Sequence, residues 1–447
     1  MALMVSVSGI RGIFGTDLTP ENLTRFSAGF GAWLDGGKVV VGRDTRVTGQ
    51  ICEDLVAATL QSCGCDVVKV GIVPTPTVAM AVLKHNAAGA VIISASHNPE
   101  QWNALKLLNS KSEFLDAEQG QQVIEHSEKK NFRYQSFNQI GGVTEDSTAL
   151  ADHINQILEL PYINPKKIAT ANFSVAIDPV NGTGGIALPP LLEKLGVKII
   201  HKLNTAPSGL FAHNPEPLPG HLQDISTLVR QKECDLGIVT DPDADRLALV
   251  TNEGEPFGEE YTQVAAFDFI LSKNPGPCAT NLSSSRAASD IAQKYGQTCF
   301  RSAVGEINVV KKMQEVDAVI GGEGNGGVIN PDLHYGRDAL VGTAIILQLL
   351  AEREISMADY RRTLPDYHMR KGRLQLDRLD GDAVLQRAKD IFSSENPDTT
   401  DGVKIDFDDG WVHLRKSNTE PIIRVYSEGT TPKKAAQLAR MVKQKVL

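Results

Sequence analysis

The sequence has few cysteines, no excess of positive charge and no long hydrophobic run, and each shortage excludes a class of protein. Six cysteines in 447 residues cannot form a dense disulfide framework, and none shows paired CxxC zinc spacing. The formal net charge is −9, so no overall positive field attracts nucleic acid or an anionic membrane. We therefore expect reduced thiols, no nucleic-acid partner, and local clusters of residues to hold any anionic ligand.

Membrane insertion and secretion are not expected either. The most apolar stretch, residues 339–351, is interrupted by Gly342, Thr343 and Gln348, and it falls short of the roughly 20 residues that a membrane span requires. The N-terminus has no cationic region before its brief apolar run, unlike a secretion signal. The sequence thus predicts a cytoplasmic protein without a membrane segment.

The order of apolar patterns predicts the fold class. Short β-branched runs alternate with helical periods from Lys38 onward, and this alternation indicates three similar α/β domains with mixed sheets. Past about residue 365, strands outnumber crossovers, which is typical of an α+β domain with an antiparallel sheet. We expect α/β domain I at 1–143, α/β domain II at 144–249, α/β domain III at 250–364 and the α+β domain IV at 365–447.

The first of four candidate loops is SASHNP, residues 94–99, directly after the apolar strand GAVII. Open α/β sheets place ligand chemistry at the carboxyl ends of their strands. Ser96 is therefore a candidate nucleophile, with His97 beside it and Lys106 ten residues further along the chain. The alternative interpretation is a Ser/Asn turn followed by proline, without chemistry.

The second loop is DPDADR, residues 241–246, after the apolar strand DLGIVT. Three carboxylates at alternate positions repel one another unless a hard cation lies between them, and few, closely set carboxylates suit Mg²⁺. An EF-hand register fails, because Arg246 stands where glycine is needed and Asn252 where a bidentate glutamate belongs. A solvated acidic turn is the alternative. The candidate metal ligands are Asp241, Asp243 and Asp245.

The third and fourth loops offer groups for hydroxyls and for phosphate. In GGEGNGG, residues 321–327, five glycines let a ligand approach the backbone while Glu323 and Asn325 can hydrogen-bond sugar hydroxyls. In RKSNTEP, residues 415–421, hydroxyl, amide and cationic groups form a phosphate cradle with the nearby Arg424. A flexible turn and a basic solvated turn are the respective alternatives.

In this order and spacing, the four loops resemble those of the α-D-phosphohexomutase superfamily over nearly the whole chain. SGIRG at 8–12, VGRDTR at 41–46 and VPTPT at 73–77 add to the match. The resemblance implies four domains around one central cleft, each contributing one loop. It also implies an isomerase that interconverts the 1-phosphate and 6-phosphate of a hexose or hexosamine.

The resemblance further implies a role for each loop. Ser96 is expected to be carried as phosphoserine, with one of its phosphate oxygens completing the Mg²⁺ site. It gives its phosphate to the bound monophosphate, and the resulting hexose 1,6-bisphosphate turns end for end before returning its other phosphate. The other expected site residues are Lys106 for the proton, Arg11 and Arg246 as supporting cations, His97 as a catalytic residue, Glu323 and Asn325 for the sugar, and Arg415, Ser417, Asn418, Thr419 and Arg424 for the idle phosphate.

Several positions bear on sugar preference. Asn325 and Gly327 replace the serine and histidine of the frequent GExSGH loop, and Pro242 and Ala244 stand where family members often have glycine. These loop sequences are more similar to the branch that includes archaeal-type phosphoglucosamine, phosphoglucose and phosphomannose mutases than to the vertebrate-type phosphoglucomutase. We expect glucosamine phosphate as the preferred substrate, with dual specificity for glucose and mannose phosphates as the second candidate.

Two alternatives belong to other classes of protein: a metal-dependent sugar phosphatase and a non-catalytic sugar-phosphate sensor. The chain could be a monomer or a homodimer.

Overall fold

The computed structural model describes residues 3–6, 9–376, 380–417 and 422–447. The chain forms two compact units, one of residues 1–262 with 325–360 and one of residues 263–324 with 361–447. Three α/β domains with mixed sheets precede an α+β domain with an antiparallel sheet, which confirms the expected fold class. The expected domain boundaries and the arrangement around one cleft stay predictions.

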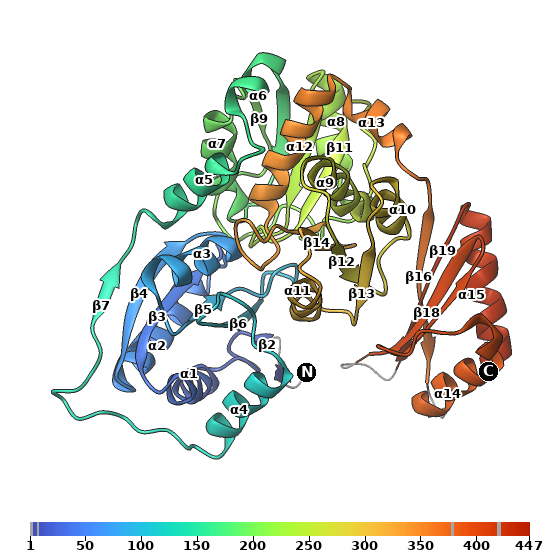
Figure 1. The fold of residues 1–447 in the computed structure, drawn as a ribbon. Coiled ribbons are helices and arrows are strands. Elements are labelled where there is room, and N and C mark those ends of the chain that lie inside the picture. Colours follow the sequence, from blue (N-terminus) through green and yellow to red (C-terminus); the bar gives the residue numbers. More distant parts are fainter. Residues whose placement is uncertain (1–2, 7–8, 377–379, 418–421) are drawn as a thin grey trace. The chain divides into compact units, whose positions relative to one another are not determined.

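The first sheet is mixed, with strand order β1-β2-β6-β5-β3-β4-β7. β3 runs parallel to β4 and β5, whereas β6 runs antiparallel to β5 and β2. Val39 and Val41 of β3 share a core with α1, α2 and α4, while Val40 packs on the other face against α3, so helices cover both faces (Figure 1). The bounds are β1 Met4–Ser6, β2 Gly9–Ile13, α1 Pro20–Leu34, β3 Gly37–Arg43, α2 Gly49–Ser62, β4 Cys65–Ile72, α3 Thr75–His85, β5 Gly89–Ile93, β6 Trp102–Asn109, α4 Ala117–Glu128 and β7 Val143–Glu145.

The second sheet, also in the first unit, has the order β11-β10-β8-β9. β8 is parallel to β9 and β10, and β11 turns back antiparallel to β10. The loop DPDADR is this turn, so its position at the strand ends follows from the hairpin. The bounds are α5 Ala149–Glu159, α6 Pro165–Ala171, β8 Ser174–Asp178, α7 Gly184–Lys194, β9 Ile199–Lys202, η1 Pro219–His221, α8 Gln223–Gln231, β10 Leu236–Thr240 and β11 Leu247–Thr251.

The third α/β passage is shared between the units. In the second unit, β12 runs parallel to β13 and β14. The apolar helix α12 belongs to the first unit, and the Asp338 carboxylate caps it by accepting the N–H groups of Leu340 and Val341. The bounds are α9 Glu259–Lys273, β12 Cys278–Asn281, α10 Ala287–Lys294, β13 Cys299–Ser302, α11 Glu306–Glu315, β14 Ile320–Glu323, β15 Gly327–Ile329, α12 Ala339–Arg353 and α13 Met357–Thr363.

The last domain is an antiparallel sheet in the order β16-β19-β18-β17. Leu374, Val412 and Val425 face α14 and α15 in one core (Figure 1). Because side chains alternate along a strand, the residues between them lie on the opposite face. The bounds are β16 His368–Gln375, α14 Gly381–Ile391, η2 Ser393–Glu395, β17 Val403–Phe407, β18 Gly410–Lys416, β19 Ile422–Gly429 and α15 Pro432–Val446.

The structure bears on two expectations from the composition, the state of the cysteines and the lack of a membrane-spanning helix. All six cysteines are free thiols, and five are buried. Within the described parts of the chain, each helix is too short or too polar to cross a bilayer.

Candidate active site

Ser96 lies in the loop between β5 and β6 with its hydroxyl turned toward the aspartate loop. Its Oγ donates a hydrogen bond to Asp241 Oδ2 over 2.7 Å, although 145 residues separate the two in the chain. The Ser96 side chain is buried, and its φ is 48°, a left-handed backbone conformation that is uncommon for residues other than glycine. The surrounding loop must therefore hold Ser96 in this geometry.

The three aspartates of the β10–β11 hairpin form one buried cluster. Each offers a carboxylate oxygen within 4.8 Å of the others, and all three are at most 1% exposed. Oδ1 of Asp243 and Oδ1 of Asp245 have no hydrogen-bond partner among the described residues. Burial, together with the charges of Asp245 and Asp243, raises the pKa of Asp241. Clustered carboxylates with unused oxygens fit a hard divalent cation.

Ala244, in the middle of the hairpin, has a φ of 51°. Only glycine adopts this conformation without a steric cost. Ala244 takes up this turn conformation, and the three carboxylates around it lie in one cluster.

Cationic side chains and one hydroxyl group, which come from several elements, contact the carboxylates. Lys106 Nζ, from β6, lies 2.6 Å from Asp243 Oδ2 and 3.6 Å from Asp245 Oδ2. Thr75 Oγ1, at the start of α3, donates to Asp243 Oδ2 over 2.6 Å, and Arg337 Nη2 donates to Asp245 Oδ2 over 2.8 Å. Burial alone would lower the pKa of Lys106, but the charges of Asp243 and Asp245 outweigh it and raise that pKa. Lys106 is therefore a protonated, well-held amine.

The remaining catalytic candidates of domain I and the hairpin also gather here. Arg246 Nε lies 3.9 Å from Asp241 Oδ2, and His97 Nδ1 lies 3.4 Å from Ser96 Oγ. Burial and the positive charge of Arg246 lower the pKa of His97 to about 2, so its imidazole is neutral. Burial and Arg246 likewise lower the pKa of Arg11, which stands on β2 opposite Ala104 of β6.

The two expected sugar readers fall in different compact units. Glu323 ends β14, and its Oε1 accepts hydrogen bonds from Asn281 Nδ2 over 2.9 Å and from the Gly305 N–H over 3.3 Å. Asn325 Oδ1 accepts the N–H of Gly327 over 3.2 Å. Their convergence on one sugar stays a prediction.

The expected phosphate cradle is described only in part, because Asn418 and Thr419 lie outside the described residues. Arg415 and Arg424 are directly paired across β18 and β19, and Arg373 of β16 is paired with Arg424. All three stand on the sheet face opposite α14 and α15. Like charges directly opposite are destabilising, so this row suits an anion. The Ser417 N–H is bonded to the Ile422 carbonyl over 3.0 Å.

Sequence reasoning missed three residues of these clusters. Thr75 lies in the matched segment VPTPT but received no role, while Arg337 and Arg373 lie outside the quoted motifs. Arg373 could have been found only by predicting that its strand pairs with the strand that carries Arg424. Arg337 has no local signal, because its approach to Asp245 depends on how the chain folds back.

The phosphoglucomutase/phosphomannomutase family models match the chain in four successive parts: alpha/beta/alpha domain I at residues 3–134, domain II at 151–254, domain III at 258–367 and the C-terminal domain at 373–445. A phosphoglucomutase/phosphomannomutase of Thermococcus kodakarensis is 35% identical, over 98% of this chain and 97% of that protein. A probable phosphoglucosamine mutase of Methanopyrus kandleri is 34% identical, over 98% of this chain and 96% of that protein.

A solved structure supports the same fold. The crystal structure of a phosphoglucomutase/phosphomannomutase family protein from Burkholderia thailandensis aligns with a TM-score of 0.87, over 99% of this chain and 98% of that chain, at 24% sequence identity.

Fold, site and relatives together define a phosphohexomutase, a metal-dependent isomerase that moves a phosphate between two positions of one sugar. The chain belongs to the phosphoglucomutase/phosphomannomutase family.

Proposed function

We propose that this phosphohexomutase acts on glucosamine phosphate, interconverting its 6-phosphate and 1-phosphate with Ser96 as the phosphate carrier. The observation that carries the proposal is the 2.7 Å contact between the buried Ser96 hydroxyl and Asp241, inside a cluster of three carboxylates. A carrier hydroxyl needs such a place, because phosphoryl transfer depends on positioning and charge stabilisation.

The reaction runs through two transfers. Phosphorylated Ser96 gives its phosphoryl group to the free hydroxyl of the bound monophosphate, forming a hexose 1,6-bisphosphate. The P–O bond to Ser96 breaks as the bond to the sugar oxygen forms. Protonated Lys106 gives a proton to the leaving Ser96 Oγ and takes up the proton of the sugar hydroxyl, so it ends the transfer protonated, as it began. After the bisphosphate turns end for end, the other phosphate returns to Ser96.

Asp241, Asp243 and Asp245, with an oxygen of the phosphoserine, would hold Mg²⁺. When bound there, the ion supplies charge neutralisation for the phosphoryl oxygens in the transition state. Arg11 and Arg246 contribute further positive charge, and Lys106 carries the transferred proton. Neutral His97 adds no charge and acts as a hydrogen-bonding group beside the Ser96 hydroxyl.

Arg415, Arg424, Ser417, Asn418 and Thr419 would grip the phosphate that is not reacting. Arg415 and Arg424 are paired across β18 and β19, and their guanidinium groups suit a phosphate dianion, because each can donate two parallel hydrogen bonds. Glu323 and Asn325 would read the sugar hydroxyls. The same phosphate-binding residues then serve both binding orientations of the sugar.

The choice of glucosamine rests on the loop forms and on the names of relatives. Full-length relatives at 34% and 32% identity are named probable phosphoglucosamine mutases. The relative at 35% is named a phosphoglucomutase/phosphomannomutase, which makes dual glucose and mannose specificity the second candidate. The sugars differ at carbon 2, where no residue has been assigned.

A substrate panel tests the sugar. Glucosamine, glucose and mannose 1-phosphates are assayed with Mg²⁺ and catalytic hexose bisphosphate. We expect the highest kcat/KM for glucosamine phosphate, with no net release of inorganic phosphate. A higher kcat/KM for glucose or mannose phosphate would establish the second candidate, and steady phosphate release would instead indicate a phosphatase.

A serine variant tests the carrier. Ser96→Ala should lower kcat by at least about 10³-fold, since an essential nucleophile is lost. Intact mass before and after phosphatase treatment should show a phosphate that maps to Ser96. Ser62→Ala, at the C-terminal end of α2, is the matched control and should keep activity, because the Ser62 hydroxyl donates only to the Ala58 carbonyl of its own helix. Full mutase activity in Ser96→Ala would refute the carrier role.

A further inference from the structure

Arg46, in the matched segment VGRDTR, is buried in the first unit and has no role in the reaction described above. An arginine side chain has five N–H donors, and here all five find acceptors. Nε donates to Asp44 Oδ2 over 3.0 Å. Nη1 donates to the carbonyls of Pro99 and Trp102 over 2.6 and 2.9 Å. Nη2 donates to the carbonyls of Ser96 and Asn98 over 2.6 and 2.7 Å.

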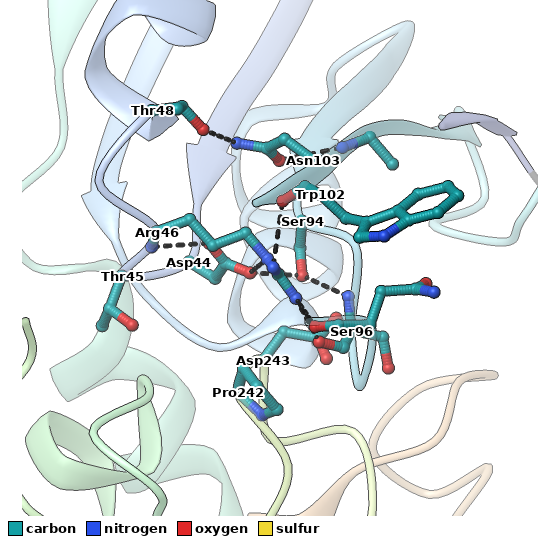
Figure 2. Close-up of polar contacts among 12 residues, drawn as sticks. Asp44, Thr45, Arg46, Thr48, Ser94, Ser96, Trp102, Asn103, Pro242 and Asp243 are labelled. Carbon is teal, nitrogen blue, oxygen red and sulfur yellow. Dashed lines mark hydrogen bonds and ion pairs between the residues drawn. The ribbon is translucent and has the colours of Figure 1, made fainter. Parts of the chain in front are cut away.

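The four carbonyls belong to one short segment, the Ser96 loop after β5 together with Trp102, the first residue of β6. Figure 2 shows the Arg46 side chain extending from its own loop into this segment, beside Ser96 and Trp102. The ring of Phe211 covers the guanidinium group at 4.9 Å. Ser96 and Trp102 are buried, and buried carbonyls need hydrogen-bond partners. This loop conformation therefore depends on the guanidinium group that lies inside it.

A second set of hydrogen bonds reaches the Ser96 N–H. Asp44 Oδ2 accepts the Ser94 hydroxyl over 2.7 Å, and Ser94 Oγ in turn accepts the Ser96 N–H over 2.9 Å (Figure 2). Arg46 is bonded to the same Asp44 oxygen. Both peptide groups of Ser96 are thus held by the Asp44–Arg46 pair, its carbonyl directly and its N–H through Ser94.

We propose that Arg46 is the positioning residue for Ser96: it keeps this serine in its left-handed conformation, with Oγ aimed at the aspartate cluster, in both phosphate transfers. The inference rests on the proposed role of Ser96 as carrier. Reacting atoms must be aligned closely, and a displacement of about 1 Å can cost about 10²-fold in rate. Lysine cannot replace Arg46, because a point charge with three donors does not match five acceptors in a plane.

The test compares Arg46→Lys with Arg387→Lys, both measured as full-length protein. Arg387 is the control because its guanidinium also donates to backbone carbonyls, those of Val446 and Leu447, on the far side of domain IV's core from the arginine row. Arg46→Lys should lower kcat by about 10²-fold while KM for the sugar phosphate stays near the wild-type value. Arg387→Lys should keep both constants.

A structural defect alone would not give this pattern. The single-turnover rate of phosphate transfer from phosphorylated Ser96 should fall with kcat, whereas circular dichroism and sugar-phosphate binding should stay unchanged. A folded Arg46→Lys variant with wild-type kcat, or a loss confined to KM, would overturn the inference.

Ser94→Ala decides the matter if Arg46→Lys does not fold. It removes only the hydroxyl that links Asp44 to the Ser96 N–H, and we expect about a tenfold fall in kcat at unchanged KM. Wild-type kcat in Ser94→Ala would then overturn the inference. Ser96→Ala, run in parallel, separates the two proposals: if it is inactive while the Arg46 and Ser94 variants are fully active, only the positioning role fails.

Discussion

At the scale of single residues, the site is a balance between buried carboxylates and buried cations. Burial alone would raise the pKa of Asp243, but the adjacent Lys106 and the hydroxyl of Thr75 outweigh it and lower that pKa. Each charge is tolerable in the interior because its partner is present. Removing one member therefore leaves the other buried without compensation.

This balance predicts the effect of Asp243→Asn. Lys106 would keep only Asp245, at 3.6 Å, and breaking a buried ion pair costs about 3–5 kcal/mol. We expect the free energy of unfolding in urea to fall by that amount and mutase activity to be lost. Asp409→Asn is the matched control, since Asp409 forms a pair of the same 2.6 Å length with Lys434 at the surface. Equal loss of stability in both variants would contradict the prediction.

At the scale of elements, an irregular segment after β9 is tied to the end of β8. The carboxylate of Asp178 accepts hydrogen bonds from the N–H of Val180 over 3.1 Å and from Asn204 Nδ2 over 3.1 Å. Its other oxygen lies 3.0 Å from His213 Nε2. Burial alone would lower the pKa of His213, but the hydrogen bond and charge of Asp178 outweigh it and raise that pKa.

The raised pKa gives a pH dependence of stability. The folded protein holds the His213 proton more tightly than the unfolded chain, so the stabilisation is fully present below about pH 6.5 and is lost as the pH rises through the raised pKa. His213→Asn should flatten the decline of the unfolding free energy across this range in urea titrations. His126→Asn is the control and should keep the wild-type slope; His126 is half-buried, and its Nδ1 lies 2.9 Å from the Asn131 carbonyl oxygen. An unchanged slope in His213→Asn would refute the linkage.

At the scale of the whole molecule, the aspartate hairpin joins parts of the first unit that are far apart in sequence. Ser96, Lys106 and Thr75 reach it from domain I, and Arg337 reaches it from the segment before α12. A cation bound by these carboxylates would stabilise the folded unit by mass action, because the unfolded chain does not assemble the site.

Metal removal tests this coupling. At about 100 times its Kd, Mg²⁺ should add about 2.7 kcal/mol to the unfolding free energy of EDTA-treated protein, seen as a higher Tm. Asp241→Asn should abolish the shift. Asp224→Asn, on the exposed side of α8, is the control and should keep it. A wild-type shift in Asp241→Asn would place the ion elsewhere.

Local patterns were enough to predict much of the fold and many of the candidate site residues. The alternation of β-branched runs and helical periods predicted the order of strands and helices, because side-chain periodicity is set within each element. Ser96 and the three aspartates were found because polar loops follow apolar strands, and strand ends share one edge of a sheet.

Which side chains contact one another across the fold could not be predicted from the sequence in this way. The Ser96 loop surrounds the Arg46 guanidinium group, Arg337 reaches Asp245, and Arg373 extends the arginine row. Each of these contacts joins segments 50 or more residues apart in the chain. The sequence by itself determined which residue types stand at the strand ends and hence the kind of chemistry. Only the tertiary structure decided which side chains meet, because long-range pairing depends on how whole elements pack and leaves no periodic trace in the chain.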